Sequence, residues 1–189
     1  MRGRPTGLPR FCGGISMKPD SDFIGEYGGV RARKSRESDL EFILAMENDV
    51  ANRDFVLQWP REKHLSLMAD KTVGHLVFES IDHRPLIGYA ILKGWDSTDR
   101  ILHFNRLVIG EKGKGYGRDA MRLVKKIAFE QLHVHRLWLD VFADNEPAIH
   151  LYRSEGFVDE GTQRDCIVHG RRYRSQMIFS ILEGEYKVV

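Results

Sequence analysis

The sequence predicts a mixed α/β domain, and three observations support this fold class. Short apolar runs alternate with amphipathic segments, in the order strand, two helices, three strands, helix, strand, helix, two strands. A glycine-rich turn joins one of these strands directly to a helix. The chain has 189 residues, of which 42% are hydrophobic, which is enough for one sizeable core and short for two. We therefore expect a single domain at residues 23–189.

The region before this domain, residues 1–22, is rich in Gly, Pro and Arg and shows neither helical nor strand periodicity. Such a segment has no apolar face to bury, so we expect a disordered tail.

The first half of the domain begins with a short alternating strand at residues 30–33. A helix is expected to start at Ser38, because acidic residues follow it in what would be the first turn. Trp59-Pro60 marks a break, after which residues 60–70 form a second short helix. The next three strands are expected at residues 75–81, 86–93 and 101–109.

The second half is expected to begin with a helix over residues 118–132, whose apolar residues fall on one face. A strand at 136–141 and a helix at 145–155 follow, and Gly156 is positioned to end that helix in a left-handed conformation. The last two strands are expected at residues 157–168 and 172–182, with a turn at His169-Gly170.

Residues 107–117, at the centre of this order, read Leu-Val-Ile-Gly-Glu-Lys-Gly-Lys-Gly-Tyr-Gly. Glycine allows close approach of the backbone, and the free N–H groups of the following helical turn can bind a phosphate. An ATP-binding P-loop needs Ser or Thr after Gly-Lys, but Gly115 stands there, which excludes that class. A dinucleotide turn needs a third glycine where Arg118 lies. Asp140 is placed like the acidic residue that binds the ribose in that class, so a dinucleotide site stays a weak alternative.

Two motifs together resemble the GNAT family of N-acetyltransferases. Residues 112–117 resemble its pyrophosphate-binding pattern Arg/Gln-x-x-Gly-x-Gly/Ala, with lysine in the first position. Residues 145–157 read Asn-Glu-Pro-Ala-Ile-His-Leu-Tyr-Arg-Ser-Glu-Gly-Phe and resemble the family's later helix. The tail at 161–186 resembles the closing hairpin of the branch that holds ribosomal-protein N-terminal (Rim-type) and spermidine acetyltransferases.

The resemblance implies a central mixed, mostly antiparallel sheet of about six to seven strands flanked by about four helices, with a splayed strand pair that holds the cofactor. It also implies transfer of an acetyl group from acetyl-CoA to a primary amine by direct attack. The amine acceptor is a protein N-terminus, a polyamine or another small amine. The expected cofactor-binding residues are Leu107, Val108, Ile109, Lys112, Gly113, Lys114, Gly115, Tyr116, Gly117, Arg118 and Asn145.

Tyr152 matches the family's tyrosine general acid. It lies seven residues after Asn145, on the same helical face. The general base stays open between His103 and Asp140, which lie on adjacent expected strands. The resemblance also implies that the segment between the first two strands borders the acceptor pocket, with Phe55, Trp59 and Glu62 as candidates to face it. Residue type alone favours Trp59 as a core residue. A non-catalytic coenzyme A binding or sensing module is the alternative function.

The composition argues against several other partners. The net charge is only +2, so no global field attracts nucleic acid or an anionic membrane, and no apolar run is long enough to span a bilayer. The eight histidines show no zinc-ligand spacing, so we expect no metal. Two distant cysteines, Cys12 and Cys166, offer no disulfide framework and fit a cytoplasmic protein. A homodimer is one option for the assembly.

Overall fold

The computed structural model describes residues 22–188, so nearly all of the tail expected at residues 1–22 lies outside the described residues. The elements are β1 (Phe23–Tyr27), β2 (Val30–Lys34), η1 (Glu37–Asp39), α1 (Leu40–Asn48), α2 (Arg61–Ala69), β3 (Val73–Ser80), β4 (Leu86–Lys93), β5 (Ile101–Ile109), α3 (Tyr116–Lys126), η2 (Ile127–Gln131), β6 (Arg136–Phe142), α4 (Glu146–Ser154), β7 (Val158–His169), β8 (Arg172–Leu182) and η3 (Glu183–Glu185).

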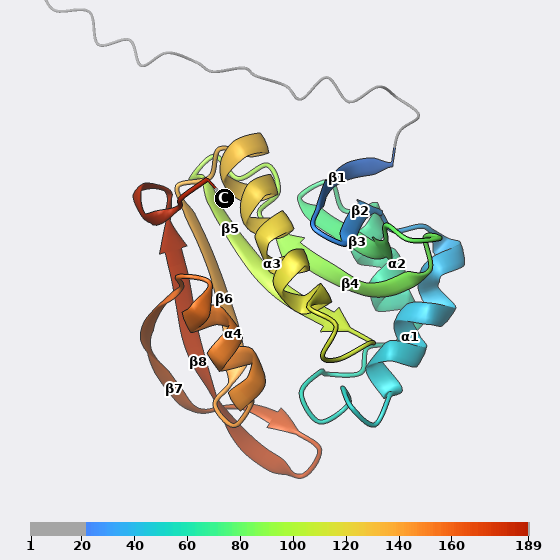
Figure 1. Cartoon of the computed structure of the whole chain (residues 1–189). Helices are drawn as coiled ribbons and strands as arrows, with labels where there is room; N and C mark the ends of the chain where they lie inside the picture. The colour runs from blue at the N-terminus through green and yellow to red at the C-terminus, as the bar shows by residue number, and fades with distance from the viewer. Residues whose placement is uncertain (1–21, 189) are drawn as a thin grey trace, which may run out of the picture.

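The strands form one eight-stranded sheet in the order β1-β2-β3-β4-β5-β6-β8-β7 (Figure 1). The β5–β6 pair is parallel, and the other neighbouring pairs are antiparallel. The predicted mixed, mostly antiparallel sheet is confirmed. It has one strand more than expected, because β1 forms a hairpin with β2 through Gly28, which has a φ of 55°. A five-residue edge strand gives too short a pattern to be separated from the tail before it.

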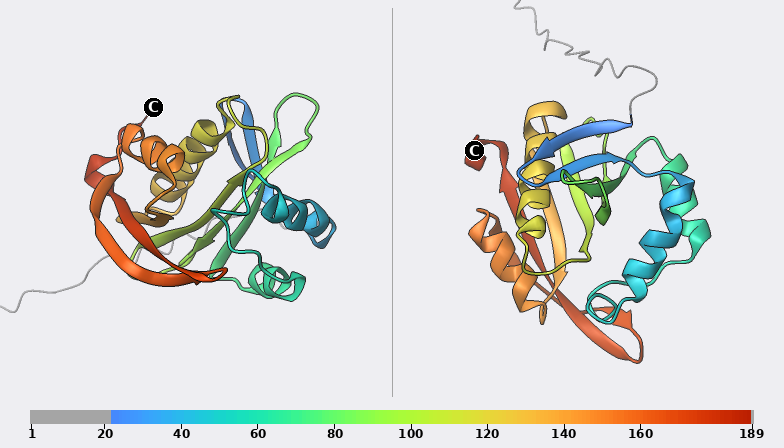
Figure 2. Two further views of the ribbon diagram at one scale, coloured as in Figure 1. Left: turned by 90° about the horizontal axis from the view of Figure 1, so that it is seen from below. Right: turned by 45° about the vertical axis from the view of Figure 1, so that its right-hand side comes forward.

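The helices cover both faces of the sheet. Figure 2 shows α3 and α4 on one side of the sheet and α1 and α2 on the other. On the α3–α4 side a large core forms, in which Met121, Val124 and Ile127 are fully buried. On the α1–α2 side a smaller core includes Leu40 and Ile43 against Val77, Tyr89 and Ile91 of the sheet. Helix α3 starts at Tyr116, two positions before the start expected at residue 118, and continues into a π-helical turn, Ile127–Gln131.

Strands β5 and β6 separate after a short paired stretch, as Figure 1 shows. Their pairing covers Ile101 to His103 on β5, and the strands then diverge. In the β4–β5 ladder, Ile91 pairs with Arg106 and Leu92 with Phe104, which leaves Asn105 as an extra residue in a β-bulge. Beyond His103, the edge of β5 that faces β6 therefore presents backbone N–H and C=O groups without a neighbouring strand.

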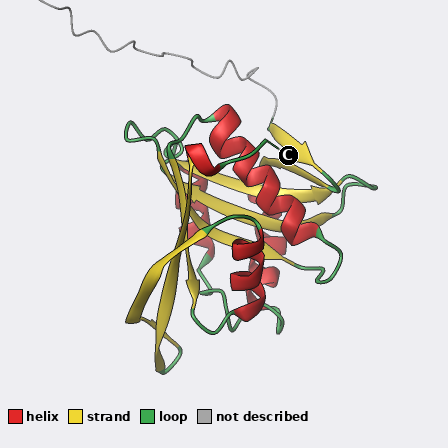
Figure 3. Ribbon diagram, turned by 60° about the vertical axis from the view of Figure 1, so that its left-hand side comes forward, coloured by secondary structure: helices red, strands yellow, loops and turns green. Residues whose placement is uncertain are grey.

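The C-terminal β7–β8 hairpin is the longest in the sheet and extends beyond the helices (Figure 3). Its turn is at Gly170, with a φ of 65°, and α4 ends before Gly156, with a φ of 88°. Both positions need the left-handed conformation that glycine adopts readily, in agreement with the sequence analysis.

Candidate active site

A cavity of about 660 Å³ opens where β5 and β6 separate. Its wall combines the segment between α1 and α2, strands β5 and β6, the glycine turn, the first turns of α4 and single residues of β7 and β8. The volume lies in the range of cavities that hold cofactors or drug-sized ligands.

The glycine turn forms one end of this cavity. Gly113 and Gly115 both have positive φ angles, 78° and 82°, and a Cβ added to either would meet no atom within 4 Å. Gly115 is the N-cap of α3, and no side chain caps that helix. The first-turn N–H groups are therefore left for a ligand, and the residues present fit a pyrophosphate.

The basic side chains beside the turn have protein partners. Lys112 lines the cavity, and its Nζ donates to Asn52 Oδ1 at 2.8 Å and to the Ile109 carbonyl at 2.7 Å. Lys114 pairs with Glu111, and Arg118 Nη1 donates to Glu155 Oε1 at 2.6 Å. Lys114 and Arg118 do not line the cavity, so their expected contact with a phosphate stays a prediction.

The separated part of β5 forms the cavity's middle section. Leu107 and Ile109 line the cavity, whereas Val108 is 2% exposed and packs in the core under α1. Asn105, the bulge residue, also lines the cavity, and its buried Oδ1 has no hydrogen-bond partner among the described residues. A buried orphan acceptor and free strand edges suit a ligand with amide groups.

Helix α4 contributes two of the predicted residues. Asn145 caps the helix by accepting a hydrogen bond from Ala148 N at 3.3 Å, and it lines the cavity. Tyr152 also lines the cavity and is 9% exposed, between Phe157 and Phe179. Burial, together with the charge of Asp140, raises the pKa of Tyr152 well above its usual value. The Tyr152 hydroxyl therefore keeps its proton.

The other end of the cavity holds a His–Asp pair. His103 Nε2 lies 2.8 Å from Asp140 Oδ1, and Gln176 Nε2 donates to Asp140 Oδ2 at 2.5 Å. The His103 ring is stacked on Trp138 with centroids 3.8 Å apart, which fixes its orientation. Asp140 and Gln176 line the cavity directly. A carboxylate with such a histidine partner has the chemistry to bind an ammonium group and to accept a proton.

Aromatic residues from the segment between α1 and α2 close this end. Phe55 and Trp59 line the cavity, and Glu62 does not. Trp59 is stacked under the Arg106 guanidinium, 3.6 Å from the ring centroid. Behind them, Glu47 is fully buried and accepts from the Trp59 N–H, Tyr89 and Arg106. Neither Glu47 nor Arg106 is predicted from the sequence as a site residue, since a helical Glu and a strand Arg normally predict exposed positions.

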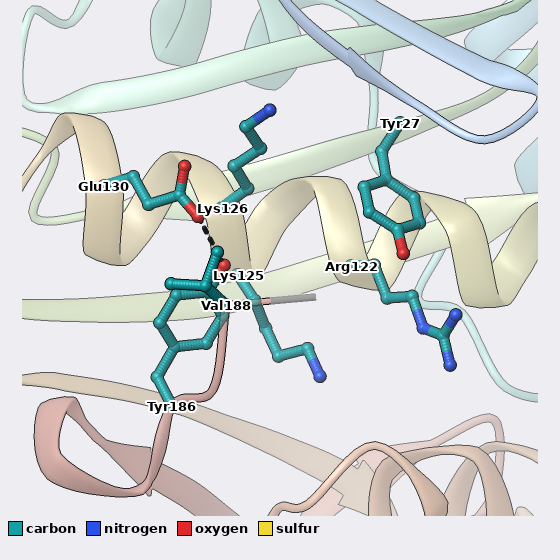
Figure 4. Close-up of a pocket in the computed structure, with 7 residues that line it drawn as sticks. All are labelled: Tyr27, Arg122, Lys125, Lys126, Glu130, Tyr186 and Val188. Carbon is teal, nitrogen blue, oxygen red and sulfur yellow. Dashed lines mark hydrogen bonds between the residues drawn. The ribbon is translucent and has the colours of Figure 1, made fainter.

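A second, smaller hollow of about 70 Å³ lies beside α3, between Tyr27 and the C-terminal segment (Figure 4). Tyr186 donates there to Glu130 Oε1 at 2.7 Å. This hollow is too small for a nucleotide-sized ligand. Within residues 22–188, no group of three His, Cys, Asp or Glu side chains is arranged to hold a metal ion. None of the described helices is long and apolar enough to cross a membrane.

Comparisons with known proteins agree with this geometry. Residues 40–157 match the sequence profile described as "Acetyltransferase (GNAT) family". The chain is 27% identical to the spermidine N(1)-acetyltransferase of Vibrio cholerae over 165 residues, which cover 82% of this chain and 93% of that protein. It is 25% identical over 166 residues to the Escherichia coli protein of the same name, with 83% of this chain and 88% of that protein covered.

Solved structures show the same fold. The crystal structure of the Vibrio cholerae spermidine N-acetyltransferase in complex with CoA and spermine superposes with a TM-score of 0.74 at 24% identity, covering 83% of this chain and 97% of that one. A point variant of the Vibrio enzyme gives a TM-score of 0.72 at 25% identity, with 82% of this chain and 95% of that one covered. With its profile match across more than half of the sequence, the chain belongs to the GNAT family of acetyltransferases and is an acetyl-CoA-dependent N-acetyltransferase.

Proposed function

We propose that residues 23–189 act as one domain that acetylates the terminal ammonium group of an alkyl amine, with a polyamine such as spermidine as the first acceptor to test. The observation that carries this proposal is the continuous cavity that joins the glycine turn to Asp140. The names and near-complete coverage of the relatives support the choice of polyamine. A cytoplasmic location fits such a substrate.

In this proposal, three parts of the chain bind acetyl-CoA at the cofactor end of the cavity. The turn at Gly113 and Gly115 binds the pyrophosphate, and the free edge of β5 at residues 105–109 bonds the pantetheine arm. Asn145 contributes its side-chain amide. Acetyl-CoA supplies an activated thioester when bound, so the protein needs only to position the amine, stabilise charge and move protons.

The chain's own residues supply both proton transfers. Asp140 holds the ammonium group and, with His103, takes its proton, which gives the neutral amine a lone pair. Tyr152, whose hydroxyl is bonded to none of the described residues, is free to give its proton to the departing sulfur. Phe55, Val56 and Trp59 offer an apolar surface for the acceptor's methylene chain.

An amine panel tests the proposal. Spermidine, spermine, a monoamine such as butylamine, an amino sugar and peptides with free N-termini are each incubated with acetyl-CoA, and release of free thiol is followed. Turnover of the alkyl amines above the other acceptors supports the proposal. Turnover restricted to peptides would show that the acceptor is a protein N-terminus and not an alkyl amine. The absence of turnover with any amine would overturn the proposed reaction.

A further inference from the structure

Glu47, in the last turn of α1, is a carboxylate with no exposed surface. One oxygen accepts the Trp59 backbone N–H at 2.8 Å, and the other accepts from Tyr89 OH and Arg106 Nη1. Burial alone would raise the pKa of Glu47, but the neighbouring His64, Arg106 and Tyr89 outweigh it and hold that pKa below its usual value. Glu47 is therefore charged.

A buried ion pair is a poor way to stabilise a protein. Desolvation of the two charges cancels most of their attraction, and apolar residues of similar volume often stabilise as well or better. The Glu47–Arg106 pair lies against the acceptor end of the cavity, since Arg106 lines it and Trp59 is stacked on Arg106. The pair therefore determines the charge on this part of the cavity wall.

Arg106 is one of three cations around the Trp59 ring. Lys63 Nζ and Lys93 Nζ each lie 5.9 Å from the ring centroid, and neither forms an ion pair among the described residues. Asp140 is the carboxylate that lines the cavity at this end. Without Glu47, Arg106 in the cavity wall and the two lysines around Trp59 would be balanced at this end only by Asp140, and an incoming ammonium group would be repelled.

We propose that Glu47 is a positioning residue that determines acceptor specificity. By neutralising Arg106 and fixing the Trp59 backbone, it makes this wall tolerant of a cationic acceptor. The inference rests on the proposed function, because it concerns acceptors that arrive as ammonium ions. Glu47 should matter more for acceptors with several positive charges, since the repulsion between the cavity wall and the acceptor grows with the number of charges that the acceptor carries.

The test compares butylamine with spermidine in wild type and Glu47→Gln. The substitution keeps the side-chain shape and removes the charge. We expect KM to rise about fivefold for butylamine and at least about tenfold for spermidine, because the Coulombic penalties of the separate charges add. The KM for acetyl-CoA is expected to stay within about twofold, since Glu47 does not line the cavity and its side chain bonds no residue of the glycine turn.

A double variant separates charge from structure. Glu47→Gln with Arg106→Gln removes both charges, and we expect the spermidine-to-butylamine KM ratio to return to within about threefold of wild type. Tyr89→Phe is the matched control, because it removes one hydrogen bond to the same carboxylate oxygen without changing charge. It is expected to lower stability and leave that KM ratio unchanged.

Two results would overturn the inference alone: an equal rise of KM for both amines in Glu47→Gln, or no recovery of the ratio in the double variant. If Glu47→Gln does not fold, Lys93→Met provides the test, since it removes a cation from the same cluster around the Trp59 ring and should lower the KM for spermidine relative to that for butylamine. A ratio unchanged by Lys93→Met would then refute the proposal. If the wild-type protein acetylates neither amine, the proposed function fails first and the inference with it.

Discussion

His103 and Asp140 lie on adjacent parallel strands, and their Nε2 and Oδ1 atoms are 2.8 Å apart at the acceptor end of the cavity. Because β5 and β6 diverge just beyond this point, the pair lies where the cavity begins to open. From the sequence, both residues are candidate bases, and no local pattern favours one of them. Because they are hydrogen-bonded and Asp140 lines the cavity, we predict that they act together, with Asp140 nearer to the acceptor.

Asp140→Asn removes the charge and keeps the shape that Gln176 contacts. We expect kcat/KM for the acceptor to fall by about 10²–10³-fold near neutral pH, because general base catalysis and the ammonium anchor are both lost. The loss should shrink as pH rises toward the pKa of the amine, since more acceptor then arrives already deprotonated. A loss that stays constant across this pH range would count against a role in deprotonation.

Tyr152→Phe keeps the ring between Phe157 and Phe179 and removes only the hydroxyl. If Tyr152 donates a proton to the leaving thiolate, turnover should fall by about 10²-fold, while acetyl-CoA affinity barely changes. Thiolates are fair leaving groups, so we expect the lower end of the usual range for an acid catalyst. A change in turnover below about threefold would assign Tyr152 to packing.

Gly115→Glu is expected to abolish acetyl-CoA binding measured by calorimetry. Its side chain would occupy the open space at the turn, and its charge would repel the pyrophosphate. Gly170→Glu is the matched control, because Gly170 also has a positive φ, 65°, and open space around it, but lies at the tip of the β7–β8 hairpin. Equal loss of affinity in both variants would contradict a phosphate cradle at Gly115.

His75 is expected to make stability depend on pH. It is 4% exposed, and burial, followed by the nearby charges of His64 and Arg106, lowers the pKa of His75 from 6.5 to about 3. The unfolded chain therefore binds a proton below about pH 6.5 that the folded chain does not. Stability is full above that pH and is lost as pH falls toward 3, at up to about 1.4 kcal/mol per pH unit.

Urea unfolding measures this slope. His75→Asn should show a shallower fall of the unfolding free energy between about pH 6 and about pH 4 than the wild type, although it is less stable at neutral pH. Parallel curves for the two proteins would mean that His75 titrates normally in the folded state.

The sequence was informative where a local pattern carries the structure. The turn at Gly113 and Gly115 needs a conformation that only glycine adopts readily, and Asn145 and Gly156 bracket one helix with standard caps. The mixed sheet and the order of its helices followed from such signals. Their boundaries agreed to within a few residues, as for β5, which spans Ile101–Ile109.

The sequence did not predict the features that depend on contacts between residues far apart in the chain. Glu47 meets Trp59, Tyr89 and Arg106 at separations of 12, 42 and 59 residues, and nothing in the helical pattern distinguishes it from a solvated Glu. Arg118 is expected to bind phosphate because it follows the glycines, and the local pattern does not show that its guanidinium also donates to Glu155, 37 residues later. Such pairings are determined by tertiary packing, which short-range periodicity does not encode.

The apolar surface at the acceptor end of the cavity comes from a different part of the chain than the glycine turn. The glycine turn and α4 follow residue 109, whereas Phe55, Val56 and Trp59 belong to one segment before α2. Substitutions at Phe55 and Val56 can therefore change the acceptor surface while the hydrogen bond from Lys112 to Asn52, which joins this segment to the glycine turn, is kept. A graft that exchanges residues 53–57 between family members, and keeps Asn52 and Trp59, is therefore expected to alter the acceptor preference and to leave the cofactor end unchanged.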